Sequence, residues 1–189
     1  MTDAQGDEIP AELRAFFDDS PTALSLASVI GDHPLVYVNR KFVDLTGYSA
    51  EEILGRNCRV LQRDVDDREA RSMLSVFLLN EDAEGVRTPI VNFRKDGTAF
   101  VNLLYLSRLR APAGQTRYFF ASQFDISRVQ PQRLNDYDRE LRRTLTRLAR
   151  LAADSGLIVE EALATIADAA ATIAQAKLTL VGLEDCSAR

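Results

Sequence analysis

The period of the hydrophobic pattern changes at Glu84-Gly85, and this change constrains the fold of the 189-residue chain most strongly. Beyond it, apolar and polar residues alternate along three runs, at 90–94, 99–108 and 117–126. Such alternation is typical of β-strands that bury one face. The Lys95-Asp96-Gly97-Thr98 segment is a good hairpin turn, and a second turn lies at 111–114. The pattern therefore predicts three consecutive antiparallel strands.

Two shorter strand patterns come earlier in the chain, at 22–29 and 35–38. The Gly31-Asp32-His33-Pro34 segment between them has the composition of a turn. The order is thus two strands, a helical stretch and three strands. This order predicts an α+β fold, in which a five-stranded antiparallel sheet carries short helices on one face.

The helical stretch contains several start and stop signals. Asn39 can cap a helix that Gly47 ends, and Ser49 with Glu52 forms a capping box. Another helix is expected to begin at Asp66. Its expected buried face consists of Met73, Leu74, Phe77 and Leu78. Repeated caps and stops indicate short helices that wrap over the sheet.

Both ends of the chain are expected to be helical. A short helix is predicted at 10–17, and a long amphipathic helix is predicted from Pro131 to about Ala153. After an interruption at 154–156, a second helix at 157–180 would complete a C-terminal helical hairpin. Each helix has more apolar surface than it could cover alone, so partner helices in the same or a second molecule are expected. We divide the chain into an N-terminal helical segment (1–20), a core domain (21–128) and a C-terminal helical extension (129–189).

Composition and charge exclude some classes of protein. No apolar run approaches the roughly 20 residues that span a bilayer, and the first residues lack the apolar core of a signal peptide. A cytoplasmic protein without membrane association is therefore expected. The formal net charge of -5 gives no overall attraction for nucleic acid. The two cysteines, Cys58 and Cys186, indicate reduced thiols rather than a disulfide framework.

Cys58 is the candidate reactive residue. An isolated cysteine is most often a small buried hydrophobe. No metal ion is expected, because His33 is the only histidine and no cysteine or histidine cluster has ligand spacing. A Cys-His nucleophile would require His33, which is expected to be a surface turn residue, to approach Cys58 in space. The residue types alone leave the role of the thiol open.

Two amides fall on the same strand faces as apolar residues. Asn102 shares a face with Leu104 and Leu106, and Gln123 shares one with Phe119 and Ala121. If these faces are covered, the amides need partners, because an unpaired buried amide costs ~1 to 3 kcal/mol. The alternative is that these faces meet solvent. The strand pattern alone leaves both alternatives open.

The segment Gly55-Arg56-Asn57-Cys58-Arg59-Val60-Leu61-Gln62 resembles the signature of light-oxygen-voltage (LOV) domains, a flavin-binding branch of the PAS fold. That signature usually reads Gly-Arg-Asn-Cys-Arg-Phe-Leu-Gln. The similarity covers about 21–127. Further matching residues are Phe42, Leu45, Thr46, Tyr48, Glu51, Asn92, Lys95, Gly97, Asn102, Phe119 and Gln123.

The resemblance implies that FMN lies between the sheet and the short helices, with riboflavin or FAD as alternatives. Blue light would then form a reversible bond between the sulfur of Cys58 and carbon 4a of the flavin ring. Asn92 and Asn102 correspond to residues that hydrogen-bond the polar edge of the ring, and Gln123 to the amide that changes partner after light. Further expected contacts with the cofactor come from Asn57, Leu61, Gln62, Leu104 and Phe119.

The phosphate end of the expected site departs from the family pattern. Arg59 corresponds to a phosphate-binding arginine, but the usual second arginine aligns with Ser75, which carries no charge. We expect Arg71, four residues earlier on the same helical face, or Arg63, which replaces a usual glycine, to take its place. If neither does, riboflavin could compete with FMN.

The resemblance to short bacterial LOV proteins predicts a blue-light photoreceptor that is not an enzyme. It would form a homodimer through its N- and C-terminal helices and signal to an unknown downstream protein. Two alternatives remain open. One is a PAS-type module that binds a ligand or partner without photochemistry, and the other is a light-regulated DNA-binding protein. Nucleic-acid binding is not favoured, because the arginine-rich face of 131–153 is more often the solvated side of a helix bundle.

Overall fold

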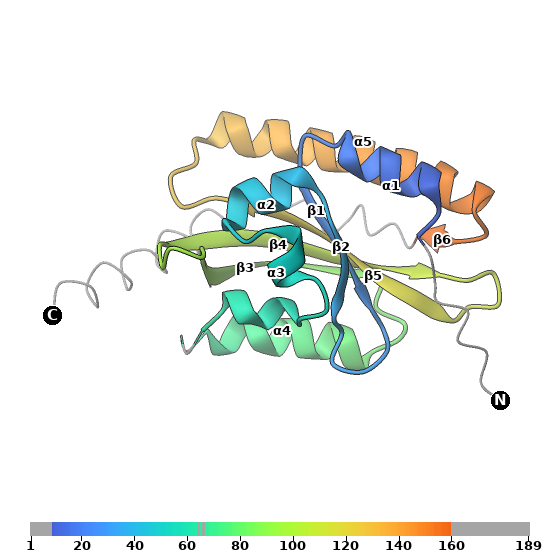
Figure 1. Cartoon of the computed structure of the whole chain (residues 1–189), viewed down its shortest axis with the longest axis horizontal. Coiled ribbons are helices and arrows are strands. Elements are labelled where there is room, and N and C mark those ends of the chain that lie inside the picture. Colours follow the sequence, from blue (N-terminus) through green and yellow to red (C-terminus); the bar gives the residue numbers. More distant parts are fainter. Residues whose placement is uncertain (1–8, 64, 66, 160–189) are drawn as a thin grey trace, which may run out of the picture.

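The computed structural model describes residues 9–63, 65 and 67–159. Its centre is an antiparallel sheet with the strand order β2-β1-β5-β4-β3 (Figure 1). The five strands are β1 (Ala23–Ser28), β2 (Leu35–Val38), β3 (Gly85–Phe93), β4 (Ala99–Arg110) and β5 (Thr116–Asp125). Because β1 pairs with both β2 and β5, the two groups of strands meet in one sheet. The predicted α+β fold with a five-stranded antiparallel sheet is confirmed.

β3 begins at Gly85, well before the strand predicted at 90–94. Pro89 lies inside it, opposite Leu103 of β4. A proline cannot donate to a strand ladder, so it is tolerated in a strand at the edge of a sheet. β3 ends the strand order on that side, which explains why the strand continues through Pro89.

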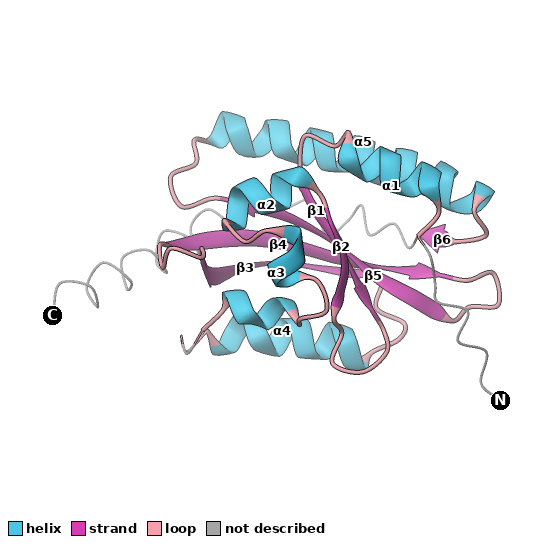
Figure 2. Ribbon diagram, in the orientation of Figure 1, coloured by secondary structure: helices cyan, strands magenta, loops and turns pink. Residues whose placement is uncertain are grey.

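Short helices cover one face of the sheet, as predicted. They are α2 (Arg40–Thr46), α3 (Ala50–Ile53), the 3-10 turn η1 (Cys58–Leu61) and α4 (Arg68–Leu79). Asn39 caps α2 by accepting the Phe42 N–H at 3.0 Å, and Gly47 ends it with a φ of 76°. The Ser49–Glu52 capping box of α3 is also present. Figure 2 shows α4 on one side of the sheet and α1 with α5 on the other.

The predicted buried face of α4 is partly wrong. Phe77 is buried, together with Ala70, but Met73 is 42% exposed and Leu78 is 37% exposed. α4 meets the sheet along a narrow stripe, and Leu74 and Leu78 border a cavity beside that stripe. Arg108 of β4 fixes the end of the helix by donating to the Phe77 carbonyl at 2.6 Å.

The start of α4 also differs from the prediction. The N-cap is Asp67, and Asp66 lies outside the described residues. Asp67 makes no side-chain cap, because its Oδ2 instead accepts the Val91 N–H at 3.0 Å. The helix is therefore anchored to the edge strand β3 at its first turn.

The opposite face of the sheet is covered by α1 (Ala11–Asp18) and α5 (Pro131–Asp154), which lie side by side (Figure 1). Leu134, Leu141, Leu145 and Leu148 of α5 are fully buried against the sheet and α1. The expected partner helix of α5 lies in the same molecule, because α1 packs against it. The sheet of the same chain covers the rest of the apolar face of α5.

The chain breaks after α5 as predicted, with Gly156 in the left-handed region at a φ of 68°. Ile158–Val159 then forms a short strand, β6, instead of the start of the predicted second helix. β6 pairs with Leu109 and Arg110 of β4, just beyond Ser107, which is the residue opposite the first residue of β3. The rest of the predicted helix, 160–180, lies outside the described residues. No helix in the part of the chain that the structure describes is both long and apolar enough to cross a membrane.

Candidate binding site

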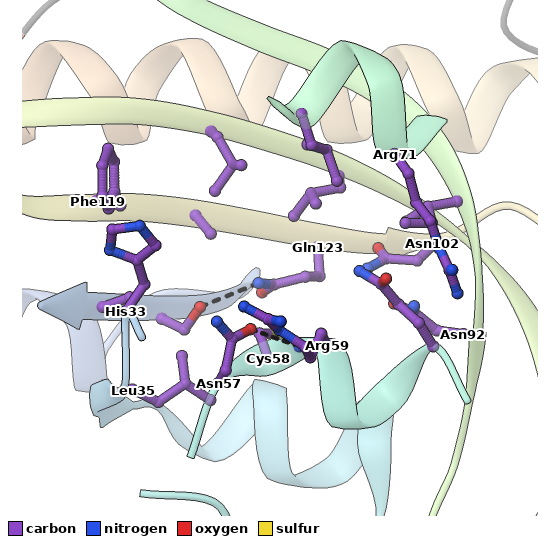
Figure 3. A pocket seen from close by; sticks show the side chains of 18 of the residues that line it. His33, Leu35, Asn57, Cys58, Arg59, Arg71, Asn92, Asn102, Phe119 and Gln123 are labelled. Atoms are coloured by element: carbon purple, nitrogen blue, oxygen red, sulfur yellow. Dashed lines mark hydrogen bonds between the residues drawn. The ribbon is translucent and has the colours of Figure 1, made fainter. Parts of the chain in front are cut away.

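A cavity of about 490 Å³ lies between the sheet and the helical segments η1 and α4 (Figure 3). Small-molecule sites typically have volumes of roughly 300 to 1,000 Å³. Its apolar walls come mainly from the sheet and α4. They consist of Ala27, Leu35, Leu74, Leu78, Ile90, Leu104, Leu106, Phe119 and Ala121. Polar groups enter from η1, α4 and four strands, so the cavity combines apolar walls with several hydrogen-bonding side chains.

Cys58 is the first residue of η1 and borders this cavity. The local sequence fixes its position, because Asn57 caps η1 by accepting the Arg59 N–H at 2.9 Å. Gly55 supplies the left-handed turn before it, with a φ of 77°. Protein atoms packed around the sulfur raise the pKa of the Cys58 thiol to about 12. The sulfur is therefore protonated at neutral pH.

Three buried amides from three strands face the cavity, and each is at most 3% exposed. Asn92 belongs to β3, Asn102 to β4 and Gln123 to β5. Asn102 donates to the side-chain oxygen of Asn92 at 2.9 Å, and its own oxygen accepts the Phe124 N–H at 3.2 Å. The alternative in which these amides meet solvent is excluded.

Gln123 has one satisfied end and one free end. Its Nε2 donates to the hydroxyl of Ser25 on β1 at 3.0 Å. Its Oε1 is buried and has no hydrogen-bond partner in the described part of the chain. A buried acceptor without a partner costs roughly 1 to 3 kcal/mol, and such groups are rare in native structures. The Gln123 oxygen can therefore accept a hydrogen bond from a ligand. If the amide rotates, its NH₂ group can donate one to the ligand instead.

Three arginines border the cavity: Arg59, Arg63 and Arg71. Arg59 pairs with Asp32, and both side chains are largely exposed, so the pair stabilises the fold little. Arg71 donates to the Arg63 carbonyl oxygen at 3.2 Å. Ser75 lines the same cavity. The arginines give the cavity cationic groups that can receive an anion.

Arg63 has an unusual backbone conformation, with a φ of 48°. This is the left-handed region, which favours glycine and explains why a glycine is usual at this position. The Arg63 guanidinium lies 4.9 Å from the centre of the Phe93 ring, and this cation–π contact holds the side chain.

The structure brings together most of the residues predicted for the site. Nine of them border the cavity together with Cys58. These nine are Asn57, Arg59, Gln62, Arg71, Asn92, Asn102, Leu104, Phe119 and Gln123. Leu61 does not border it, because this side chain packs in a separate cluster with Phe42 and Ile53.

Sequence reasoning missed two polar residues of the cavity. The alternation of β1 places Ser25 on the same face as Ala27, and both line the cavity. The sequence pattern did not indicate that this serine has a role in the site. His33 is half-buried, and its ring meets the Phe119 ring edge-on at 5.1 Å. The prediction that His33 is a surface turn residue is therefore wrong, because the turn folds back over the cavity.

The fold and this cavity define a sensor domain of the PAS type, and the family model for the PAS domain matches residues 21–128. A crystal structure of the Rhodobacter sphaeroides LOV protein is 30% identical, with a TM-score of 0.71 over 89% of this chain and 94% of that protein. The chain belongs to the LOV family of PAS domains. A solved RNA-binding light-oxygen-voltage receptor is 35% identical, with a TM-score of 0.57 over 82% of this chain and 42% of that one.

Curated relatives correct one prediction. Blue-light-activated histidine kinase 2 of Erythrobacter litoralis (strain HTCC2594) is 38% identical over 123 residues, which make up 64% of this chain. The chain spans only 35% of that kinase. The prediction that the chain falls in a non-enzymatic class is overturned, because its curated relatives are named as kinases.

The cavity fits the flavin chromophore that LOV relatives imply. A flavin ring is flat, apolar on its faces and polar along one edge. The cavity has Ile90, Leu104 and Phe119 as apolar walls. The unpaired Gln123 oxygen and the two asparagines supply both hydrogen-bond donors and hydrogen-bond acceptors.

Proposed function

We propose that the chain is a blue-light photoreceptor that holds FMN in the cavity and uses Cys58 as its reactive group. One observation carries this proposal: a protonated thiol and a buried amide with an unpaired oxygen border the same cavity. A protonated thiol is a poor nucleophile, so Cys58 would react only after light has made the bound flavin reactive. The membership in the LOV family agrees with this role.

The three amides would hold the polar edge of the flavin ring. Asn92 and Asn102 satisfy each other only in part, because each amide has more hydrogen-bonding capacity than their shared bond uses. Asn57 and Gln62 would contact the ring or the ribityl chain from the η1 side. The walls formed by residues such as Leu104 and Phe119 would pack against the ring and exclude water.

FMN is the proposed flavin, in preference to riboflavin or FAD, because cationic side chains border the cavity. Arg59 and Arg71 would pair with the phosphate through charge-assisted hydrogen bonds. Arg71 takes the place of the usual second arginine at Ser75. Arg71 lies on α4 one turn before Ser75, which favours it over Arg63 for this role.

A bound flavin supplies the absorption of blue light and an electrophilic ring carbon. The chain supplies the sulfur of Cys58 and keeps it protonated in the dark, because burial raises the pKa of the thiol. Gln123 can follow a change in the hydrogen bonding of the ligand by turning its carboxamide, since one end donates and the other accepts.

The route from Gln123 to the C-terminal helix is short. Its neighbours on β5, Ser122 and Phe124, both contact Tyr137 of α5. The hydroxyls of Ser122 and Tyr137 lie 3.1 Å apart, and the Phe124 and Tyr137 rings stack with their centres 4.3 Å apart. A shift of β5 at Gln123 would therefore reach α5 through one side chain.

We further propose that light changes the association of the chain. A homodimer formed through the N- and C-terminal helical regions would be read by a downstream protein of unknown identity. α1 and α5 pack together on the sheet face opposite the cavity, so a movement of α5 would reach both helices. Sedimentation velocity in the dark and under blue light tests this, and identical distributions would contradict a change of assembly without affecting the photochemistry.

RNA binding is a second candidate output, because the structure of an RNA-binding LOV receptor aligns with 82% of the length of this chain. The solvent side of α5 is rich in arginine, although Arg139 and Arg143 lie 3.4 and 3.5 Å from acidic residues of the same helix. Retention of labelled RNA in the dark and under light, at several salt concentrations, tests this output. Retention that does not respond to light would reject it.

The photoreceptor proposal is tested by purifying the protein in the dark, identifying any flavin by mass spectrometry and recording its absorption spectrum before and after blue light. We expect bound FMN, loss of its blue absorption band on illumination and recovery in darkness. A colourless protein, or a yellow one that ignores blue light, would favour a PAS-type module without photochemistry.

A further inference from the structure

Ser25 and Gln123 form a polar pair inside an apolar part of the cavity wall. Both are 2% exposed, and they lie on neighbouring strands, β1 and β5. The dashed line at Gln123 in Figure 3 marks the 3.0 Å hydrogen bond from its Nε2 to the Ser25 hydroxyl. Beside this pair, the cavity-lining residues Ala27 and Ala121 have no polar side-chain atoms.

The bond divides the Gln123 carboxamide into two ends with different tasks. One end is held by β1, and the other, Oε1, is buried without a partner in the described part of the chain. If the amide turns over to present its NH₂ group to a ligand, its oxygen faces Ser25 instead. The end that faces away from the ligand then needs a hydrogen-bond donor.

A hydroxyl group can serve both orientations. It accepts from the NH₂ group in one orientation and donates to the oxygen in the other, because its hydrogen rotates freely about the C–O bond. Alanine or valine at this position would leave the held end of the amide without a partner in either orientation. The serine therefore suits a partner amide that changes orientation.

We propose that Ser25 is the positioning residue of Gln123, with a hydroxyl that satisfies whichever end of the carboxamide faces away from the bound flavin. The proposal rests on the photoreceptor function proposed above. Ser25 sets how firmly the amide is held in each state, and thereby the lifetime of the light state. It does so without touching the reactive sulfur.

The test uses the full chain as purified in the dark, with Ser25→Ala, Ser25→Thr and the control Ser28→Ala. Ser28 lies on the same strand, and its hydroxyl accepts the Ile30 N–H at 3.0 Å outside the cavity. The first readout is the NMR signal of the Gln123 side-chain NH₂ group and the exchange rate of its hydrogens with water. The second is the rate of dark recovery of the flavin absorption.

Ser25→Ala should shift the Gln123 NH₂ signal, speed its hydrogen exchange and change the dark-recovery rate by about tenfold. Ser25→Thr keeps a hydroxyl and should restore both readouts, while Ser28→Ala should match the wild type. The proposal would be overturned if Ser25→Ala left the position of the NH₂ signal unchanged and kept the hydrogen-exchange and dark-recovery rates within twofold of the wild type. If the wild type shows no photochemistry, the photoreceptor function fails, whereas the NMR readout still decides whether Ser25 holds Gln123.

Discussion

Tyr137 joins β5 to α5 in the proposed signalling route, and replacing it should separate photochemistry from output. It is 4% exposed, shares a hydrogen bond with Ser122 and stacks on Phe124. Tyr137→Leu keeps an apolar side chain on α5 but removes both links. The stack contributes about 0.5 to 1.5 kcal/mol, and the Ser122 hydroxyl left without this partner costs about 1 to 3 kcal/mol.

The expected loss in the free energy of unfolding is therefore about 1.5 to 4.5 kcal/mol. For a chain of this size, this is a fall in Tm of roughly 3 to 18 °C. The control is Leu148→Ala, which empties a fully buried position farther along α5 and should cost about 2 to 5 kcal/mol. The two variants thus weaken α5 to a similar extent. Only Tyr137→Leu cuts the contacts next to Gln123.

Hydrogen exchange of the α5 amides, measured in the dark and under continuous blue light, distinguishes the two variants. We expect the wild type and Leu148→Ala to show a light-dependent change in α5 protection. Tyr137→Leu should bleach and recover normally at the flavin but lose this change. An unaltered light-dependent difference in Tyr137→Leu would refute the coupling through Tyr137.

Three further predictions concern an ion pair, the phosphate group and the thiol. Asp138→Leu should lower the free energy of unfolding by about 3 to 5 kcal/mol in urea denaturation, because it removes the carboxylate that pairs with the buried Arg87 guanidinium. Combining it with Arg87→Met should recover part of that loss. Arg71→Ala should lower FMN retention and raise the riboflavin share in the extracted flavin, and unchanged flavin content would reject its phosphate role. Burial raises the pKa of the Cys58 thiol to about 12, so the unfolded chain releases this proton at lower pH than the folded chain. Relative to Cys58→Ala, the wild type should lose about 1.4 to 2 kcal/mol of stability between pH 8 and pH 10, and a flat difference would contradict the thiol's burial.

Local signals in the sequence predicted local structure well. The caps at Asn39 and Ser49 depend on atoms within four residues, so the residue types alone identify them. The same holds for the hairpin turn at Gly97, whose φ of 93° suits glycine. Period-two alternation likewise predicted which face of β4 and β5 carries Asn102 and Gln123.

Patterns that depend on distant partners were less informative. The apolar spacing of α5 fits a sheet and a second helix equally well, and only the fold shows that the sheet and α1 cover it together. For α4, the spacing could not tell that Leu78 borders a cavity or that Met73 faces solvent. The Ile158–Val159 strand depends on an open stretch of β4, which no local pattern reveals.

The site shows the same division. The resemblance to LOV domains assigned roles to Cys58 and the amides, and the fold brings these residues around one cavity. Ser25 was missed because its partner, Gln123, lies 98 residues away. His33 was missed because a turn composition says nothing about the Phe119 ring beneath it.

The light-minus-dark absorption spectrum of the wild type and of Cys58→Ala tests most directly whether Cys58 is the photoreactive group. Both proteins should bind the same flavin, because the alanine leaves the amides and the apolar walls in place. Blue light should bleach the wild-type flavin band reversibly and leave the Cys58→Ala band unchanged. The same reversible bleaching in Cys58→Ala would contradict the role of the thiol.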